Sequence, residues 1–225
     1  MISTNGSSAA MPAPPGEVDR VRSHWWWRRG WRPDRSFYTW HLTFEGSSEL
    51  HDLVSSCHAA LSEVNGLDLV PSEWLHVTMQ GVGFIDDVRT EDVDRIVDAA
   101  RVRLARLPPL RLTFRSAVIR TEAVALPPIP AGEVRGVRFA IRRGIADVWG
   151  TDNVPELPDP YEPHLSVAYV NTDQRAHPIA KALAGVRPEP VTARLTRASL
   201  IILRREDHLY RWDSYASVPF DDARR

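Results

Sequence analysis

The stretch "WLHVTMQGVG" (residues 74–83) alternates apolar and polar residues over its first half, which is typical of a half-buried β-strand. Side chains of a strand point alternately to its two faces, so His76 and Thr78 share one face of the predicted strand. The stretch "PHLSVAYV" (residues 163–170) repeats the arrangement with His164 and Ser166. The sequence therefore predicts two strands, one in each half of the chain, that each present an imidazole next to a hydroxyl.

Helical and strand-like segments alternate around these two strands. Apolar residues at helical spacing predict helices over 47–64, with a Ser-x-x-Glu-like start at Ser47, and over 90–107, 133–150 and 176–186. Strand-like patterns cover 37–46, 67–84, 110–126, 163–170, 191–205 and 210–220. Several strands follow one another without a helix between them, which favours antiparallel pairing over a doubly wound parallel sheet. We therefore predict an α+β fold. The order strand, helix, His-x-hydroxyl strand, helix occurs in each half, which fits two pseudo-symmetric lobes.

Composition narrows the class of protein. The 225 residues are 43% hydrophobic and 25% charged, as in ordinary globular domains, and the net charge of −1 means that any site for a polyanion must be a local patch. The single cysteine, Cys57, excludes an internal disulfide and favours a reducing compartment. There is no apolar run of about 18 residues and no secretory signal pattern, so we expect a cytoplasmic protein without a membrane partner.

The N-terminal region differs from the rest of the chain. Residues 1–20 are rich in Ser, Ala, Pro and Gly, which predicts a disordered tail. Residues 21–35, called the Trp/Arg segment below, contain four tryptophans among arginines. The tryptophans either stack on nucleic-acid bases or pack on the domain. We favour packing, which still lets the segment form one wall of a cleft. The globular pattern covers residues 36–225.

Two histidine–hydroxyl pairs suit a particular chemistry. Attack on a phosphodiester needs a base for the nucleophile and an acid for the leaving oxygen, and histidine performs both tasks near neutral pH. A hydroxyl one pleat away can hold a phosphate oxygen. The alternative is that both are buried histidines bonded to the backbone. A single His-x-Ser/Thr pattern is weak evidence for a site in a chain with eight histidines, and the pattern occurs a third time at His41. Two such patterns on strands in separate halves of the chain are stronger evidence.

The motifs "HVTMQGVG" and "PHLSVAYV" resemble those of the two-histidine (2H) phosphoesterases, in the branch called 2′-5′ RNA ligase-like or RNA 2′,3′-cyclic phosphodiesterase. The resemblance covers roughly residues 36–225 and implies two lobes around a central cleft. It implies that His76 and His164 are the acid/base pair, with His164 as base and His76 as acid in hydrolysis. It further implies that Thr78 and Ser166 anchor the phosphate, and that no cofactor or metal ion is needed.

Two positions depart from the family pattern. Tyr169 stands where many members have an arginine, five residues after the second histidine, and Gly81 stands where the first motif often has an aromatic residue. Both departures concern the recognition of an RNA end as substrate more than the phosphodiester chemistry. We name Gln80, Tyr169 and His41 as candidate substrate contacts. For Gln80 a solvated or sheet-bonded side chain is an equal alternative.

Three functions remain open at this stage. The leading hypothesis is a metal-independent phosphoesterase that hydrolyses 2′,3′-cyclic phosphate or 2′-5′ phosphodiester bonds of RNA or small nucleotides, with ligation as the reverse reaction. The second is a non-catalytic module that binds an RNA end or a nucleotide. The third is a transferase or lyase acting on a small phosphorylated metabolite. We expect a monomer whose partner is its substrate, without an obligate protein partner.

Overall fold

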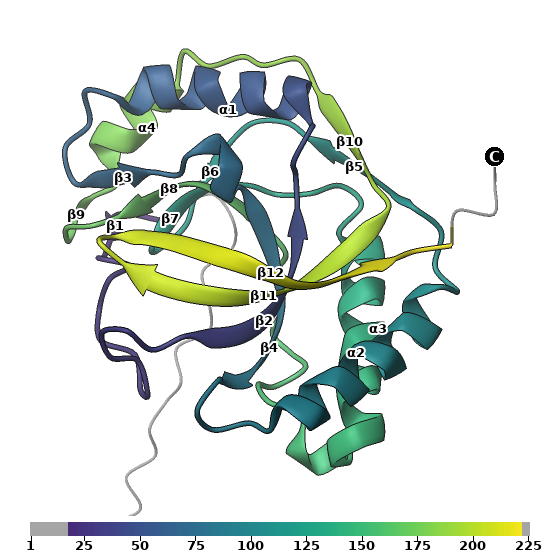
Figure 1. The fold of residues 1–225 in the computed structure, drawn as a ribbon. Coiled ribbons are helices and arrows are strands. Elements are labelled where there is room, and N and C mark those ends of the chain that lie inside the picture. Colours follow the sequence, from purple (N-terminus) through teal and green to yellow (C-terminus); the bar gives the residue numbers. More distant parts are fainter. Residues whose placement is uncertain (1–17, 222–225) are drawn as a thin grey trace, which may run out of the picture.

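A computed structural model describes residues 18–221 and has one main antiparallel sheet flanked by helices (Figure 1). In spatial order the main sheet contains β12 (Leu209–Pro219), β11 (Arg197–Glu206), β2 (Phe37–Thr43), β4 (His76–Phe84), β8 (Leu165–Val170), β7 (Ala123–Leu126) and β6 (Val118–Ile119), and β3 (Leu67–Leu69) pairs with β8. Two separate antiparallel pairs are β5 (Leu110–Phe114) with β10 (Val191–Leu195) and β1 (Arg20–Val21) with β9 (Gln174–Arg175). The predicted α+β class with mainly antiparallel pairing is confirmed.

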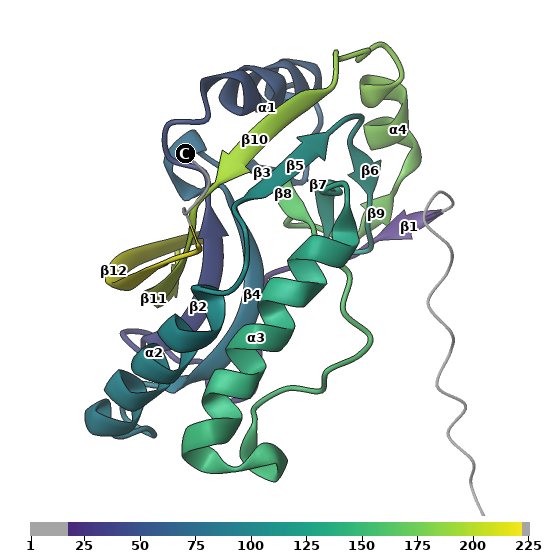
Figure 2. The same cartoon turned by 90° about the vertical axis from the view of Figure 1, so that its right-hand side faces the viewer.

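The helices divide between the two halves of the sheet. They are α1 (Ser48–Leu61), α2 (Thr90–Leu104), α3 (Ala131–Trp149) and α4 (His177–Leu183), with short 3₁₀ turns at Ser72–Trp74 and Thr151–Asn153. The pair α2 and α3 lies against the half that contains β2, β4 and β12, whereas α1 and α4 cover the half that contains β8 (Figures 1 and 2). No helix in the described part of the chain is long and apolar enough to cross a membrane.

Each predicted helix and strand segment contains an element of the predicted type. The segment 110–126 is broken into β5, β6 and β7 rather than forming one long strand. Ser47 is the N-cap of α1, where the sequence places the start of the helix, but its side chain makes no capping hydrogen bond. Most of the predicted tail, residues 1–17, lies outside the described residues, and Arg20 of its last three already belongs to β1.

The apolar sides of both halves form one continuous core. Large side chains such as Trp40, Phe44 and Phe114 are fully buried in it. The helices α2 and α3 approach closely at Gly144, where a Cβ would lie 3.0 Å from the backbone nitrogen of Ala100 and 3.1 Å from its Cα. A side chain at Gly144 would therefore push the two helices apart, and the absence of one fixes their spacing.

This contact generates a stability prediction. Gly144→Ala should lower the free energy of unfolding by about 1–3 kcal/mol relative to Gly136→Ala, because overpacking a close helix contact strains backbone that cannot move freely. Gly136 lies on the same helix with no atom within 4 Å of its would-be Cβ. The control should therefore gain about 0.5–1 kcal/mol from improved helix propensity. Urea denaturation of the two variants measures the difference, and equal stabilities would contradict the close packing.

Candidate active site

The two halves of the main sheet are joined at one paired position, Val77 of β4 opposite Leu165 of β8. Each is the middle residue of a His-x-hydroxyl motif, and both side chains are 0% exposed on the core side. The flanking motif residues therefore project from the opposite face of the sheet. Because the pairing is antiparallel, His76 of β4 is the neighbour of Ser166 on β8, and Thr78 of β4 is the neighbour of His164 on β8. One register thus gathers all four motif side chains.

A β-bulge follows the first motif. On β2, the neighbours Trp40 and His41 pair with Gln80 and Thr78 of β4, so Met79 is the extra residue. The bulge turns Gln80 to the face of Trp40, away from the motif residues. Gln80 is 0% exposed, its side-chain nitrogen donates to the carbonyl oxygen of Pro155 at 2.6 Å, and its side-chain oxygen accepts from Arg142 at 2.7 Å. The interpretation of Gln80 as a substrate contact is therefore wrong, because its side chain lies on the face opposite to that of His76.

A matching bulge follows the second motif. Neighbours Val124 and Ala125 of β7 pair with Ala168 and Ser166 of β8, which leaves Val167 as the extra residue. After this bulge Tyr169 points to the same side as Ser166, although simple alternation would place it on the other. Both motifs thus end in a bulge directly after the hydroxyl residue, one in each half of the sheet.

The four motif residues line one cavity of about 570 Å³. Its lining also includes polar and aromatic side chains from outside the two motifs. They are His24, Arg28 and Trp31 of the Trp/Arg segment, Phe37, Thr39 and His41 of β2, Arg120, Glu122, Glu156, Glu162, Tyr169 and Tyr210. The candidates His41 and Tyr169 are therefore at this cavity and Gln80 is not. Among residues 18–221, no group of three His, Cys, Asp or Glu side chains is arranged to hold a metal ion.

The rings of His76 and His164 are held in the same way. Nδ1 of His76 lies 2.8 Å from the carbonyl oxygen of Trp74, and Nδ1 of His164 lies 2.9 Å from the carbonyl oxygen of Glu162. A carbonyl oxygen only accepts, so each Nδ1 carries the hydrogen, and in the neutral ring Nε2 is the free acceptor. In both motifs the partner carbonyl is two residues before the histidine, so the chain orients each imidazole locally.

Burial keeps both rings neutral. Removal from water lowers the pKa of His76 to about 4, against the backbone hydrogen bond that raises it, and the neighbouring His164 and His24 lower it further. Burial also lowers the pKa of His164, and the charge of Arg120 adds to this effect. Near neutral pH the cavity therefore contains two imidazoles that are ready to accept protons at Nε2.

His41 supports the first motif from the neighbouring strand. Its ring is stacked on that of His76, with centroids 4.2 Å apart and planes 7° from parallel. Its Nε2 lies 3.4 Å from the hydroxyl of Thr78, and burial lowers its pKa well below the usual value. Two charged rings could not stack at this distance without strong repulsion. A neutral His41 therefore packs against the ring of His76 and limits its movement.

The Trp/Arg segment supplies side chains that the motif analysis did not identify. The ring of His24 stacks on that of Tyr169 at 4.4 Å, its Nε2 lies 2.9 Å from the hydroxyl of Tyr210, and its Nδ1 lies 3.3 Å from a carboxylate oxygen of Glu122. Burial lowers the pKa of His24, so in the neutral ring Nδ1–H donates to Glu122 and the tyrosine hydroxyl donates to Nε2.

Glu122 joins the segment to the rest of the cavity wall. Burial would raise the pKa of Glu122, but hydrogen bonds from His24 and Arg22 and the charge of Arg28 outweigh burial and place it at about 2. Nothing in the sequence around Glu122 indicates this role, because all its partners come from residues about 100 positions earlier. The segment does not bury all its tryptophans: Trp25 packs against the core, whereas Trp27 is 71% exposed.

Comparisons with known proteins point to one family and one fold. A family model described as the 2′-5′ RNA ligase superfamily matches residues 47–207, which is more than half of the chain. No curated protein shows significant sequence similarity to this chain. Among solved structures, the TT0787 protein of Thermus thermophilus is similar in fold, with a TM-score of 0.61 and 17% identity over 83% of this chain and 98% of that chain.

The LigT protein of E. coli is also similar in fold. Its complex with 3′-AMP gives a TM-score of 0.61 and 15% identity, and its complex with ATP gives 0.56 and 16%. Each match covers 83% of this chain and 99% of that chain. The Trp/Arg segment and His41 lie before the residues that the family model matches.

The buried state of His76 predicts a pH dependence of stability. The unfolded chain takes up this proton near pH 6.5, but the folded chain only near pH 4, so acidification through this window favours unfolding, and the full stability is present above it. As the pH falls from 7 to 5, proton uptake by His76 in the unfolded chain should by itself lower the free energy of unfolding by about 2 kcal/mol. In His76→Asn this part should disappear.

Urea denaturation of both proteins at the two pH values measures the effect, because the groups that titrate elsewhere are the same in both. An equal loss of stability in the wild type and in the variant would show that His76 is not held neutral by burial.

Proposed function

The chain belongs to the 2′-5′ RNA ligase superfamily, and we propose that it is a phosphoesterase that opens 2′,3′-cyclic phosphates of nucleotides or RNA ends with His76 and His164 as its acid/base pair. One observation carries the proposal. The two rings present equivalent Nε2 atoms to one cavity, each fixed by a backbone carbonyl two residues earlier. A histidine that served only packing would not need this shared orientation toward a common space.

The hydroxyls of Thr78 and Ser166 suit the binding step. Thr78 is on the same strand as His76 and is the cross-strand neighbour of His164. Ser166 is on the same strand as His164 and is the cross-strand neighbour of His76. A phosphate between the two rings can therefore accept a hydrogen bond from either hydroxyl through its non-bridging oxygens. Donors placed in this way hold the phosphorus for in-line attack and stabilise charge that develops on these oxygens.

The reaction needs two proton transfers. We assign His164 as the base, whose Nε2 removes a proton from water as the water oxygen forms a bond to phosphorus. We assign His76 as the acid, whose Nε2 gives a proton to the ribose oxygen as its bond to phosphorus breaks. The products are a phosphomonoester and a free ribose hydroxyl. Each transfer is typically worth about 10²–10⁴-fold in rate.

His76 must carry a proton to act as the acid, although burial disfavours it in the free protein. The negative charge of the bound phosphate provides the missing stabilisation, because an anion within about 4–6 Å raises the pKa of an imidazole. The acid is therefore formed when substrate binds. If a ribose hydroxyl of a second RNA end takes the place of water, His164 removes its proton as the new oxygen–phosphorus bond forms and His76 again protonates the leaving ribose oxygen. The product is then a phosphodiester and a free ribose hydroxyl, which is the chemistry of ligation.

The size of the cavity and the related structures support a nucleotide substrate. A volume of about 570 Å³ lies within the usual range for small-molecule sites. The related LigT protein forms complexes with 3′-AMP and with ATP. A nucleoside 3′-phosphate is one of the two products that opening of a 2′,3′-cyclic phosphate can give, so we propose that this cavity accepts the same class of ligand.

Substitution of the motif residues tests the proposal. His76→Ala and His164→Ala should each lower kcat for a nucleoside 2′,3′-cyclic phosphate by about 10²–10⁴-fold, because one proton transfer is lost. Thr78→Val and Ser166→Ala should cost about 10–10³-fold, because a donor to the phosphate is lost. His177→Ala, at an exposed histidine outside the cavity, is the control and should keep wild-type turnover.

The assay monitors ring opening by chromatography and locates the product phosphate on O2′ or O3′. Wild-type turnover should continue in EDTA, since the two imidazoles supply both proton transfers. Normal turnover in either histidine variant would refute the assignment. Tight binding of a cyclic nucleotide by the wild type without any product after long incubation would favour a binding module instead.

A further inference from the structure

We propose that Arg28 forms a second anion subsite beside the two histidines, and that the preferred substrate therefore carries another phosphate next to its cyclic one. The chemical class is a 5′-phosphorylated nucleotide or an oligonucleotide that ends in a 2′,3′-cyclic phosphate. This inference rests on the proposed function for the identity of the cyclic group. The anion subsite itself rests on the geometry of the Trp/Arg segment.

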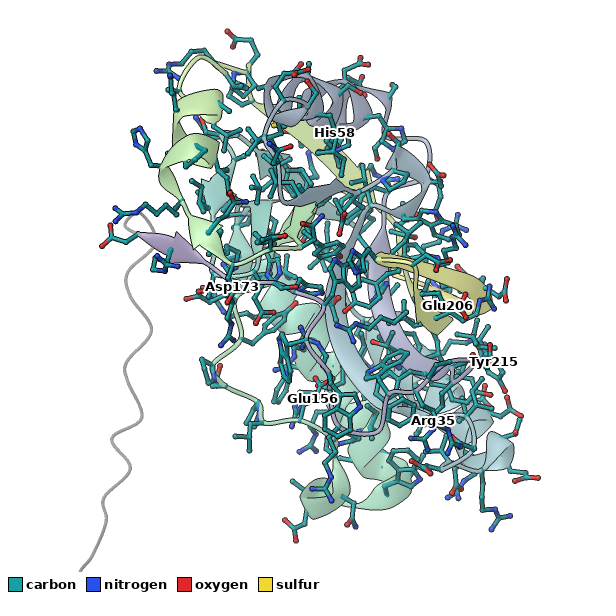
Figure 3. All side chains as sticks on the ribbon, turned by 90° about the vertical axis from the view of Figure 1, so that its left-hand side faces the viewer. Arg35, His58, Glu156, Asp173, Glu206 and Tyr215 are labelled. Carbon is teal, nitrogen blue, oxygen red and sulfur yellow. The ribbon has the colours of Figure 1, made fainter. Side chains whose placement is uncertain are left out.

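The backbone around Arg28 is held firmly to the domain. On one side the backbone nitrogen of Ser23 donates to Asp173 at 2.8 Å, and on the other side Arg35 binds Asp86 at 2.7 Å; Asp173 and Arg35 are labelled in Figure 3. Between them, Arg205 donates at 3.0 Å to the carbonyl oxygen of Trp26. A cation on this segment is therefore presented to the cavity by a fixed support.

The guanidinium of Arg28 is only partly satisfied. Its Nη2 donates to a carboxylate oxygen of Glu122 at 3.0 Å, and its Cζ lies 4.6 Å from the ring centre of Trp26. Within residues 18–221, no hydrogen bond forms at its Nε, which is buried, or at its Nη1. A guanidinium offers five N–H groups, and its planar fork suits the oxygens of a phosphate. Because Nε is buried, the donors left for a ligand are those of Nη1, on a side chain that is 32% exposed.

The charge balance at Arg28 also favours an anion. Glu122 is shared between two guanidinium groups, Arg28 and Arg22, the latter at 2.7 Å, so one positive charge remains in excess. The other arginine that lines the cavity, Arg120, pairs with one carboxylate, that of Glu162, at 3.1 Å. Arg28 is thus the cavity arginine with the less complete neutralisation.

The position of Arg28 indicates which phosphate it would bind. Tyr169 lies on the same face of β8 as Ser166, and the ring of His24 stacks on that of Tyr169 with centroids 4.4 Å apart. Nδ1 of His24 and Nη2 of Arg28 then meet the same carboxylate oxygen of Glu122, at 3.3 and 3.0 Å. The order along the wall is therefore the second motif, then Tyr169 and His24, then Arg28. A phosphate held between the pair leaves Arg28 for a neighbouring phosphate.

The chain offers a matched control in Arg22. Arg22 binds the same carboxylate as Arg28, but its side chain is 61% exposed and it does not line the cavity. If Arg28 served only to hold Glu122 and the segment in place, Arg28→Gln and Arg22→Gln would have similar effects. If Arg28 binds substrate, only its own variant changes the preference for the second phosphate.

The experiment compares adenosine 2′,3′-cyclic phosphate with its 5′-phosphorylated form. The wild type and Arg22→Gln should favour the 5′-phosphorylated substrate by about tenfold or more in kcat/KM, since an arginine–phosphate contact is a strong charge-assisted one. In Arg28→Gln the preference should fall to within about threefold, because kcat/KM falls more for the 5′-phosphorylated substrate than for the unphosphorylated one. No preference in the wild type, or its equal loss in both variants, would overturn the proposal.

A binding arm separates this proposal from the proposed function. Calorimetry compares adenosine 3′-monophosphate with adenosine 3′,5′-bisphosphate, neither of which needs to react. The wild type should bind the bisphosphate more tightly, and Arg28→Gln should bind the two alike. If the wild type opens neither cyclic substrate, the proposed reaction fails, and the calorimetric preference alone decides whether Arg28 is an anion subsite. Equal binding of both ligands by the wild type would reject the subsite.

Discussion

The site depends on the register between β4 and β8. Val77 and Leu165 pair at the one position where the two halves of the main sheet meet, and both side chains are buried in the core. Hydrophobic burial therefore fixes which face of each strand is turned to the cavity, because a slip of one residue would exchange the two faces. His76, Thr78, His164 and Ser166 reach one cavity as a consequence of this apolar pair rather than through contacts of their own.

The second constraint is electrostatic. Burial removes the imidazoles from water, and the backbone carbonyls of Trp74 and Glu162 each take one ring hydrogen. Both rings are thereby neutral and present the same nitrogen, which is the state of a base. In the proposed mechanism an acid arises only when an anion enters, so the resting site does not need to hold two like charges close together. The ring of His41, which stacks on that of His76, is also neutral and adds no positive charge beside it.

Much of the fold was predictable from the sequence, because it follows from local patterns. Alternation around Val77 and Leu165 predicts which residues of each motif share a face, and helical spacing predicts the four helices found in residues 18–221. The bulges at Met79 and Val167 were not predictable, because a bulge is defined by the partner strand. They remove Gln80 from the cavity and bring Tyr169 to it. The contacts of His24 and Arg28 with Glu122 were likewise hidden, because they join residues about 100 positions apart.

The central claim is that His76 and His164 are neutral rings that share one bound anion through Nε2. Nuclear magnetic resonance of the ¹⁵N-histidine-labelled protein at pH 7, before and after addition of inorganic phosphate, tests it directly. The account predicts the Nδ1–H tautomer for both residues in the free protein and a shift of at least one toward the protonated ring when phosphate binds. An Nε2–H tautomer at either residue, or two rings that do not respond to phosphate, would contradict the account.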